Sequence, residues 1–417
     1  MKSPADVIIG AGVVGLHIAY YLRQQGRDVV VIDRDNADNN CSFGNAGYIS
    51  PSHFIPLATP GIVWQGLKWM LDATSPFYIK PRFNKNLIRW GYSFWKSASK
   101  TNVHKNAPHL FHLLSLSRTL SIELHQTLGH SFGLKEDGCF MLYVDKQTAK
   151  HEKELAREAQ VSYGMDVPVF SREELLAHEP LISKNVLGGA YYKIDCHLNP
   201  GLMMNTLQKH LKEDGVVFIQ NETIRSFTKS GGKVTQVVGK NYDFLVDNLF
   251  IASGSWSQQV AEQLGINILL EAGKGYSFTY QHPSKNIHHP AILVDHRVAM
   301  TPLGPDLRVG GTMELAGLDR RISSRRIPPI IHAANYYFDD LQLPVPPMEK
   351  VWSGLRPVSP DGLPYIGRDE KYQNVYLGSG HAMIGISSAA ATGYLLAQLS
   401  TGHKPAIGMD AFRVNRF

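Results

Sequence analysis

The chain has 417 residues, which is more than a single hydrophobic core usually supports, so its length predicts about two domains. Its composition, 43% hydrophobic and 19% charged, is that of a folded globular protein and excludes extensive disorder. The net charge of +6 favours an anionic substrate, a nucleotide phosphate or an acidic membrane surface as partner. Nucleic acid is not expected, because the basic residues are scattered except for Arg320, Arg321, Arg325 and Arg326.

The cysteines and the apolar segments bear on the cellular location. Cys41, Cys139 and Cys196 have no metal-ligand spacing, which predicts reduced thiols and no metal site. The first residues enter a strand pattern without a charged leader, so export is not expected. The apolar run from Val7 to Leu22 contains three glycines and is too short to span a bilayer. We therefore expect a cytoplasmic protein, either free or attached peripherally to the inner face of the cell membrane.

The first forty residues have the order of a dinucleotide-binding unit. A buried strand at Asp6–Ile9 runs directly into the sequence G-A-G-V-V-G at 10–15. A helical pattern follows and stops at Gly26, and a second strand at Val29–Ile32 ends in Asp33. A lone glycine motif is weak, but here the flanking strand, helix, strand and acid all agree. The segment therefore predicts dinucleotide binding.

Each residue of the glycine motif has a physical role. Gly10 permits the tight turn from strand to helix, Gly12 lets the backbone approach a pyrophosphate, and Gly15 lets the helix pack against the strand. The helix begins near Val13 and Val14, where unpaired N–H groups and a partial positive charge favour phosphate.

The acid at the end of the second strand predicts which nucleotide fits. Asp33 is placed to accept hydrogen bonds from a ribose hydroxyl pair and would repel a 2′-phosphate, which disfavours NADP. Arg34, the next residue, is a further candidate cofactor contact. The motif by itself does not separate NAD from FAD.

The rest of the chain alternates between helix and strand patterns. The loop from Asp35 to Ser52 is rich in Asn, Gly and Ser, and such a long loop is uncommon unless it is functional. Helices are expected at Gly61–Asp72, Asn84–Ser99, Pro108–Leu128, Leu202–Lys212 and Ile386–Leu399. Strands are expected at Cys139–Val144, Gly188–Tyr192, Val216–Ile219 (buried), Leu245–Ala252, within Ala272–Gly311, and at Tyr365–Ile366 and Val375–Leu377.

The nucleotide-domain patterns lie at the start, in the middle and at the end of the chain. We therefore predict an α/β protein, α+β overall, in which a Rossmann-like domain is interleaved with a substrate domain built on a mixed or antiparallel sheet. The predicted nucleotide domain comprises 1–60, 195–270 and 345–417, and the substrate domain 61–194 and 271–344. The cleft between two such domains is a usual place for a small-molecule site.

Six segments carry a family resemblance that extends over essentially the whole chain. They are G-A-G-V-V-G at 10–15, S-F-G-N-A-G-Y-I-S-P at 42–51, P-G-I-V-W-Q-G-L-K-W-M at 60–70, G-K-G-Y-S at 273–277, W-S-G-L-R-P-V-S-P-D-G-L-P-Y-I-G at 352–367 and L-G-S-G-H-A-M-I-G at 377–385. In this order they resemble the FAD-dependent D-amino-acid oxidase and glycine oxidase superfamily. Within it, the sequence is most similar to the bacterial D-amino-acid dehydrogenase small subunit, including relatives that act on hydroxy-D-proline.

The resemblance implies an FAD-binding domain of the glutathione-reductase type and adds candidate cofactor contacts. Small and polar residues of one loop would bring backbone amides to the flavin ring; they are Ser42, Asn45, Ala46 and Gly47. The alternative is that this loop is an ordinary turn. The resemblance places backbone contacts to adenine at Val217, with its side chain in the core, and a pyrophosphate loop at Ser253, Gly254 and Trp256. No cysteine lies near 352–362, so FAD is expected to be non-covalent.

A third group of implied contacts precedes the last helix. Gly380, Met383, Ile384 and Gly385 lie where a helix N-terminus would stabilise the negative N1/C2=O edge of reduced flavin. His381 either touches flavin or substrate or serves as a local polar anchor.

The resemblance also places the substrate site. Arg356 falls where the family binds the substrate carboxylate, which suits an oriented and permanently charged fork. The alternative is a surface arginine paired with Asp361 or Glu349. Further candidates are Tyr276 as a hydroxyl donor or pocket wall, Tyr48 and His53 as pocket residues, and Arg297 or Arg308 in place of Arg356. Met383 stands where some glycine-oxidase relatives have a second arginine, so a larger or cyclic amino acid is favoured over glycine.

The implied reaction is oxidation of a small amino acid, in which the α-hydrogen leaves as hydride to flavin N5 and the imino acid gives a 2-oxo acid. The D configuration comes from the resemblance alone. Alternatives are an O2-using amino-acid or sarcosine-type oxidase in place of a quinone-linked dehydrogenase, or a flavin-binding subunit of a larger complex. The amphipathic stretch Pro60–Tyr78 fits either membrane docking or core packing, and a homo-oligomer is left open.

Overall fold

The computed structural model describes residues 3–36, 40–62, 64, 66, 77–80, 82 and 84–417. Within these residues the strands form two large sheets and one small pair, β3 (Tyr48–Ile49) with β8 (Cys196–His197). The helices are α1 (Val13–Gln24), α3 (Lys85–Ser97), α4 (Lys100–Thr127), α5 (Lys146–Tyr163), α6 (Arg172–Leu175), α7 (Pro200–Glu213), α8 (Ser257–Gln263), α9 (Pro328–Tyr337) and α10 (Gly385–Ser400).

The first sheet contains both parallel and antiparallel strand pairs. Its strand order is β10 (Ile224–Ser230), β11 (Lys233–Gly239), β12 (Asp243–Ile251), β1 (Ala5–Ile9), β2 (Val29–Ile32) and β9 (Val217–Ile219). Strand β19 (Val375–Ser379) pairs in parallel with β12, and β18 (Tyr365–Arg368) pairs antiparallel with β19. The sheet is thus parallel from β9 to β12 and antiparallel where β10, β11 and β18 are added. The central strands are continuous Val and Ile runs because both of their faces are buried.

Helices cover both faces of this sheet. Ile8, Val31 and Phe250 pack with residues of α1, α4, α7 and α10 in one core cluster. Their neighbours Val7 and Val30 point to the opposite face, where they pack with β11 and α8 in a second cluster. Side chains of a strand alternate between faces, so each buried run contributes to both clusters.

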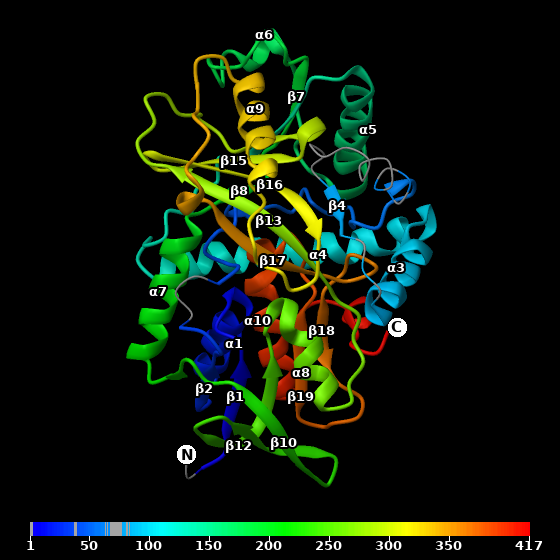
Figure 1. The fold of residues 1–417 in the computed structure, drawn as a ribbon, viewed down its shortest axis with the longest axis vertical. Coiled ribbons are helices and arrows are strands. Elements are labelled where there is room, and N and C mark those ends of the chain that lie inside the picture. The colour runs from blue at the N-terminus through cyan, green and yellow to red at the C-terminus, as the bar shows by residue number, and fades with distance from the viewer. Residues whose placement is uncertain are drawn as a thin grey trace.

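The second sheet is mixed. Its order is β17 (Trp352–Val358), β13 (Glu271–Tyr280), β16 (Asp306–Leu315), β15 (Val298–Leu303), β14 (Ala291–Leu293), β5 (Cys139–Tyr143), β7 (Gly188–Tyr192) and β6 (Val169–Ser171), with β4 (Phe77–Ile79) parallel to the end of β16. Helix α9 covers one of its faces. Figure 1 shows this sheet in the upper half of the molecule and the first sheet below it, with α4 crossing between them. The predicted α/β class with a second, mixed sheet is confirmed.

Three sequence expectations differ from the structure. Helix α4 begins at Lys100 rather than Pro108, because Ser99 caps it and accepts a hydrogen bond from the Asn102 N–H at 3.2 Å, which leaves Pro108 inside the helix. The strand at 217–219 lies at the sheet edge, so Val217 is 42% exposed instead of buried. Strand β17 belongs to the second sheet, although the predicted boundary assigned 345–417 to the nucleotide domain. The helix expected at Gly61–Asp72 lies largely outside the described residues.

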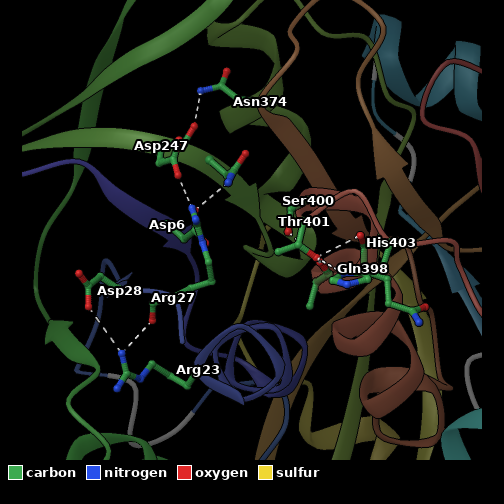
Figure 2. A network of polar contacts seen from close by, with 12 residues as sticks. Asp6, Arg23, Arg27, Asp28, Asp247, Asn374, Gln398, Ser400, Thr401 and His403 are labelled. Carbon is green, nitrogen blue, oxygen red and sulfur yellow. Dashed lines mark hydrogen bonds and ion pairs between the residues drawn. The ribbon is translucent and has the colours of Figure 1, made fainter. Parts of the chain in front are cut away.

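A buried ion pair fastens the end of the first sheet opposite its glycine turn. The fully buried Asp6 accepts two hydrogen bonds from the Arg27 guanidinium, at 2.8 and 2.9 Å, and a third from Asn248 at 2.8 Å. Arg27 also contacts Asp247, and the Asn374 amide donates to the Asp247 carbonyl at 2.7 Å (Figure 2). These contacts join β1 to β12 and to the residue before β19.

Replacing Arg27 is expected to lower stability. The change Arg27→Ala would leave the Asp6 carboxylate buried without its cation, which costs about 3 kcal/mol or more. Thermal unfolding would detect this as a clear fall in Tm. The control Lys209→Ala removes an exposed pair with Glu213 and should change stability by less than about 0.5 kcal/mol. Equal Tm values for both variants would contradict the assigned role.

Candidate functional site

One cavity of about 1280 Å³ lies between the two sheets. Its lining includes Ile9 and Ile32 at the carboxyl ends of β1 and β2, and Met141, Ile292 and Ala299 on the facing side of the second sheet. A pocket for one drug-sized ligand occupies about 300–1000 Å³, so this cavity has room for a dinucleotide together with a small molecule. In doubly wound sheets, the carboxyl ends of the strands are the usual ligand crevice.

The glycine turn has the geometry that a dinucleotide site requires. Gly10 has φ of 114°, and a Cβ there would lie 2.5 Å from the Ala252 carbonyl oxygen. A Cβ on Gly15 would lie 1.9 Å from the Gly10 oxygen, so the helix packs against the turn as predicted. The nearest atom to a Cβ on Gly12 is the Ser42 hydroxyl at 3.7 Å, which leaves the approach to the helix N-terminus open.

The far end of the cavity is lined by polar and aromatic groups around Asp33. Its carboxylate accepts hydrogen bonds from the Ala11 N–H at 2.7 Å and the Asp35 N–H at 3.0 Å, and burial raises the pKa of Asp33. The Arg34 guanidinium lies over the Trp256 ring at 4.6 Å. Glu222 and Thr223 also line this end. Val217 was expected in their place, but β9 ends before the cavity.

The loop at 42–47 is held by the second sheet through its carbonyl groups. The Arg308 guanidinium donates to the Phe43 and Asn45 carbonyls, both at 2.8 Å, and the Ser277 hydroxyl donates to the Gly44 carbonyl at 2.7 Å. Arg308 is therefore occupied as a clamp, and burial lowers its pKa to about 10. Ser42, Asn45 and Ala46 of this loop line the cavity, while the N–H groups of Ser42, Asn45 and Gly47 bind acceptors within residues 40–45.

Arg356 is the cation of the second sheet that faces the cavity with few partners. Its guanidinium donates to the Thr312 carbonyl at 2.7 Å, and no ion pair to it is found in the described parts of the chain. Asp361, the suggested partner of a surface arginine, instead binds Arg416 at 2.7 Å. Desolvation by the surrounding protein lowers the pKa of Arg356, although the side chain keeps partial exposure where it lines the cavity.

Two neighbouring backbone positions, Gly275 and Thr312, accommodate the Arg356 side chain. A Cβ on Gly275 would lie 2.1 Å from the guanidinium, so a side chain at this position of β13 would displace Arg356 from its present place. Thr312 has φ of 71°, which is strained for a β-branched residue and orients the carbonyl that holds Arg356. Neither residue was singled out from the sequence.

The two tyrosine candidates line the cavity, but their hydroxyls are engaged elsewhere. The Tyr276 hydroxyl donates to Glu314 at 2.7 Å, inside a buried group that also contains Lys274 and Arg326. The Tyr48 hydroxyl lies 2.9 Å from the Ala291 carbonyl and 2.8 Å from the Met300 carbonyl. Each hydroxyl has one proton, so neither is free to bind a substrate carboxylate, and both residues act as cavity walls.

The two histidine candidates are neutral. Burial lowers the pKa of His381 to about 3 and that of His53 to about 4. His381 Nε2 lies 3.0 Å from the Thr392 hydroxyl, whose proton goes to the Ser388 carbonyl, so the histidine is the donor. His381 therefore anchors the start of α10 while it lines the cavity. His53 Nδ1 lies 3.3 Å from the hydroxyl oxygen of the preceding residue, Ser52.

Most of the predicted site residues meet at this cavity. Those in its lining are Gly10, Gly12, Val13, Val14, Asp33, Arg34, Ser42, Asn45, Ala46, Tyr48, His53, Ser253, Gly254, Trp256, Tyr276, Arg356, His381, Met383, Ile384 and Gly385. Four others lie outside it: Gly15, Gly47, Val217 and Gly380. The three glycines shape the neighbouring backbone, since Gly47 and Gly380 have φ of 87° and 85° and Gly15 lets α1 approach the turn.

Comparison with known proteins identifies the family. The family model described as FAD dependent oxidoreductase, DAO, matches residues 7–399. The chain belongs to this family. It is 32% identical to a D-amino acid dehydrogenase of Granulibacter bethesdensis over 99% of both chains, and 30% identical to one of Vibrio vulnificus over 98% of this chain and 99% of the relative.

Solved structures share the fold. Glycine oxidase from Geobacillus kaustophilus has a TM-score of 0.78 at 20% identity and covers 100% of both chains. L-proline dehydrogenase from P. horikoshii has a TM-score of 0.78 at 19% identity, covering 100% of this chain and 98% of the other. The family membership and the glycine turn together make this chain an FAD-dependent oxidoreductase. In the described residues, no helix has the length and apolarity needed to cross a bilayer.

Loss of the Arg308 clamp is expected to weaken FAD binding. The change Arg308→Leu removes the donor to two loop carbonyls, each bond to a charged donor being worth about 1.5–3 kcal/mol, so a rise in Kd of tenfold or more is expected. Titration of the apoprotein with FAD would measure it. The matched control is Arg225→Leu on the exposed strand β10. Equal affinities in both variants would show that the clamp does not order the loop.

Proposed function

We propose that the chain oxidises the α C–N bond of a small amino acid, with a D-amino acid or hydroxy-D-proline as the substrate class. The observation that carries this proposal is Arg356, a cation that lines a cavity whose other end fits a dinucleotide and whose guanidinium binds one backbone carbonyl, that of Thr312. A partly desolvated charge that has no acidic partner among the described residues is stabilised by an anion from outside. The carboxylate of an amino acid meets that need, and the curated relatives are D-amino acid dehydrogenases.

The residues present fit FAD. Gly12 leaves the N-terminus of α1 accessible to a pyrophosphate, and Asp33 retains acceptor capacity toward ribose hydroxyls. At the other end, Met383, Ile384 and Gly385 bring the N-terminus of α10 to the cavity. When bound, FAD supplies a ring that accepts a hydride from the substrate α-carbon. No cysteine lies in 352–362, so attachment is proposed to be non-covalent.

The chain itself contributes position and charge. Arg356 would hold the carboxylate by its guanidinium fork, and the Thr312 carbonyl and the space above Gly275 fix the plane of that fork. Tyr48, Tyr276 and Met383 add rings and a thioether to a lining that also contains Arg297 and Arg320. The rings and the thioether favour a substrate with a carbon side chain or ring over glycine.

Exchange of Arg356 tests the proposed substrate anchor. Wild-type protein with FAD is expected to lose its flavin colour anaerobically with members of a panel of D- and L-amino acids, sarcosine, prolines and hydroxyprolines. Arg356→Ala should keep its flavin spectrum but lose about 30-fold or more in kcat/KM, since truncating one partner of a buried charge pair costs about 2–5 kcal/mol. Arg356→Lys should restore part of the loss.

Two outcomes would contradict the anchor. Unchanged Michaelis constants in Arg356→Ala would remove the carboxylate role, and a wild-type flavin that no member of the panel bleaches would remove the proposed substrate class. The control Arg225→Ala changes an exposed arginine on β10 and should leave kcat/KM unchanged.

The electron acceptor is proposed to be a membrane quinone, reached at the inner face of the cell membrane. Helix α3 supports this with two distinct faces. Trp90, Gly91 and Phe94 line the cavity, whereas Ile88, Tyr92 and Trp95 are 62–64% exposed at spacings of four and three residues. Helix α3 lies at the right-hand edge of the molecule in Figure 1. Trp64, 73% exposed, adds a second indole to the described surface before it.

Charge around α3 fits an anionic lipid surface. The sequence has no acidic residue between Asp72 and Glu123, while exposed cations lie along α3 and the start of α4: Lys85, Arg89, Lys96 and Lys100. Aromatic rings with Lys and Arg are the residues that favour the bilayer interface. The expected docking segment Pro60–Tyr78 lies mostly outside the described residues, so the proposal rests on α3. A homo-oligomer stays a prediction.

Membrane docking through α3 is tested by vesicle flotation. The chain should float with vesicles rich in phosphatidylglycerol and remain unbound with pure phosphatidylcholine. The double change Tyr92→Ser, Trp95→Ser should weaken binding about tenfold or more, because two exposed rings lose their apolar contact with lipid. The control Tyr242→Ser removes a ring that is 60% exposed in the β11–β12 hairpin and should not matter. Equal flotation of both variants would contradict docking by α3, and stoichiometric peroxide release with substrate would contradict the quinone acceptor.

A further inference from the structure

A hydrogen-bonded chain of three side chains leads from the cavity into the protein. His53 lines the cavity, and its Nδ1 lies 3.3 Å from the Ser52 hydroxyl. The Ser52 hydroxyl donates to Asp195 Oδ2 at 2.5 Å, and the Ser52 N–H donates to Asp195 Oδ1 at 3.1 Å. Asp195 has no exposed surface, and Ser52 is 9% exposed. Two hydrogen bonds thus fix Ser52 between the carboxylate and the imidazole.

The direction of these bonds assigns the protons. Ser52 has a single hydroxyl proton, which goes to Asp195, so the Ser52 oxygen accepts from His53 Nδ1–H. The other ring nitrogen of His53, Nε2, then carries a lone pair. A neutral imidazole with Nδ1–H and a free Nε2 is the form that can take up a proton at one nitrogen and release another at the opposite one.

We propose that His53, Ser52 and Asp195 form a proton path that removes one proton from the substrate ammonium group. The ammonium N–H bond breaks and His53 Nε2 gains the proton, while His53 Nδ1–H passes its proton to Ser52 and Ser52 passes its own to Asp195. The substrate is left with a neutral amine lone pair, and no electrons change hands. His53 is the contact residue, and Ser52 and Asp195 are positioning and proton-storing residues. This inference rests on the proposed amino-acid substrate.

The surroundings of Asp195 suit a proton acceptor that works near neutral pH. Burial raises the pKa of Asp195 to about 7, against the lowering effect of the Ser52 bonds, whereas burial holds His53 neutral with a pKa of about 4. His53 therefore relays the proton and does not store it. Among the described residues, the ionisable groups that interact electrostatically with Asp195 come from five other elements and include one cation: Arg118 of α4, Tyr48 of β3, Cys139 of β5, Tyr192 of β7 and Cys196 of β8.

The sign of the pH effect follows from this arrangement. Above about pH 7 Asp195 is ionised and can accept the relayed proton, and below it the site is already protonated. The rate of anaerobic flavin reduction at low substrate should therefore rise with pH through about 7. General acid–base groups contribute about 10²–10⁴-fold, so Asp195→Asn should lose that much at neutral pH. It should regain activity as the pH approaches the pKa of the substrate ammonium, where free amine is supplied by the solvent.

The experiment compares pH profiles of kcat/KM for the FAD-loaded wild type, Asp195→Asn, Ser52→Ala and His53→Gln. All three variants should lose the limb near pH 7 and converge with the wild type at high pH. Ser52→Ala keeps the backbone bond to Asp195, so it serves if Asp195→Asn fails to fold. The control Ser121→Ala removes a buried hydroxyl on α4 and should retain the wild-type profile.

The outcomes separate this inference from the proposed function. Folded variants that bind FAD and lower kcat/KM equally at every pH, or not at all, would overturn the proton path while the substrate assignment stands. A wild type that no amino acid reduces would instead overturn the proposed function.

Discussion

The guanidinium of Arg356 lies partly desolvated in the cavity lining, and its described partner is a single carbonyl oxygen, that of Thr312. Removing a cation from water costs several kcal/mol, and a neutral carbonyl recovers only part of that cost. The protein keeps the group there by leaving out a side chain at Gly275 and by accepting a strained Thr312. Binding of an anion to Arg356 would recover this desolvation cost. The other residues of the cavity lining must therefore leave the guanidinium accessible to an anion.

The second constraint is the connection between the two sheets. The loop after β2 belongs by sequence to the nucleotide unit, but its carbonyls are held by Arg308 and Ser277 of the second sheet. Its Ser42 hydroxyl accepts the Val13 N–H of α1 at 3.0 Å. The loop is therefore hydrogen-bonded both to helix α1, which packs on the first sheet, and to the second sheet. The two walls of the cavity share one piece of backbone, so their relative position is fixed by hydrogen bonds within the chain.

Local patterns could be predicted from the sequence, and contacts between distant elements could not. The turn at Gly10 was found because strand, turn and helix are consecutive. Val217, the expected adenine contact, lies outside the cavity lining, because a strand pattern does not show that β9 is an exposed edge strand. The resemblance located Arg356, but its glycine cradle and Thr312 lie on strands paired only in the fold. Tyr48 and Tyr276 lie at the cavity as predicted, and only the structure shows that their hydroxyls are already used.

The same reasoning explains why His53 matters more than its pKa suggests. Taken alone, a buried histidine with a pKa of about 4 is a poor base. The proposed role of His53 depends on the groups to which it is hydrogen-bonded. A proton relay needs only a fast exchange of protons and a final acceptor of suitable pKa. Ser52 provides the exchange and Asp195 the acceptor, in a segment where the backbone of Ser52 is itself bound to the carboxylate. Burial thus has two separate effects, because it keeps the contacting group neutral beside a cationic amine and raises the pKa of the storing group toward the working pH.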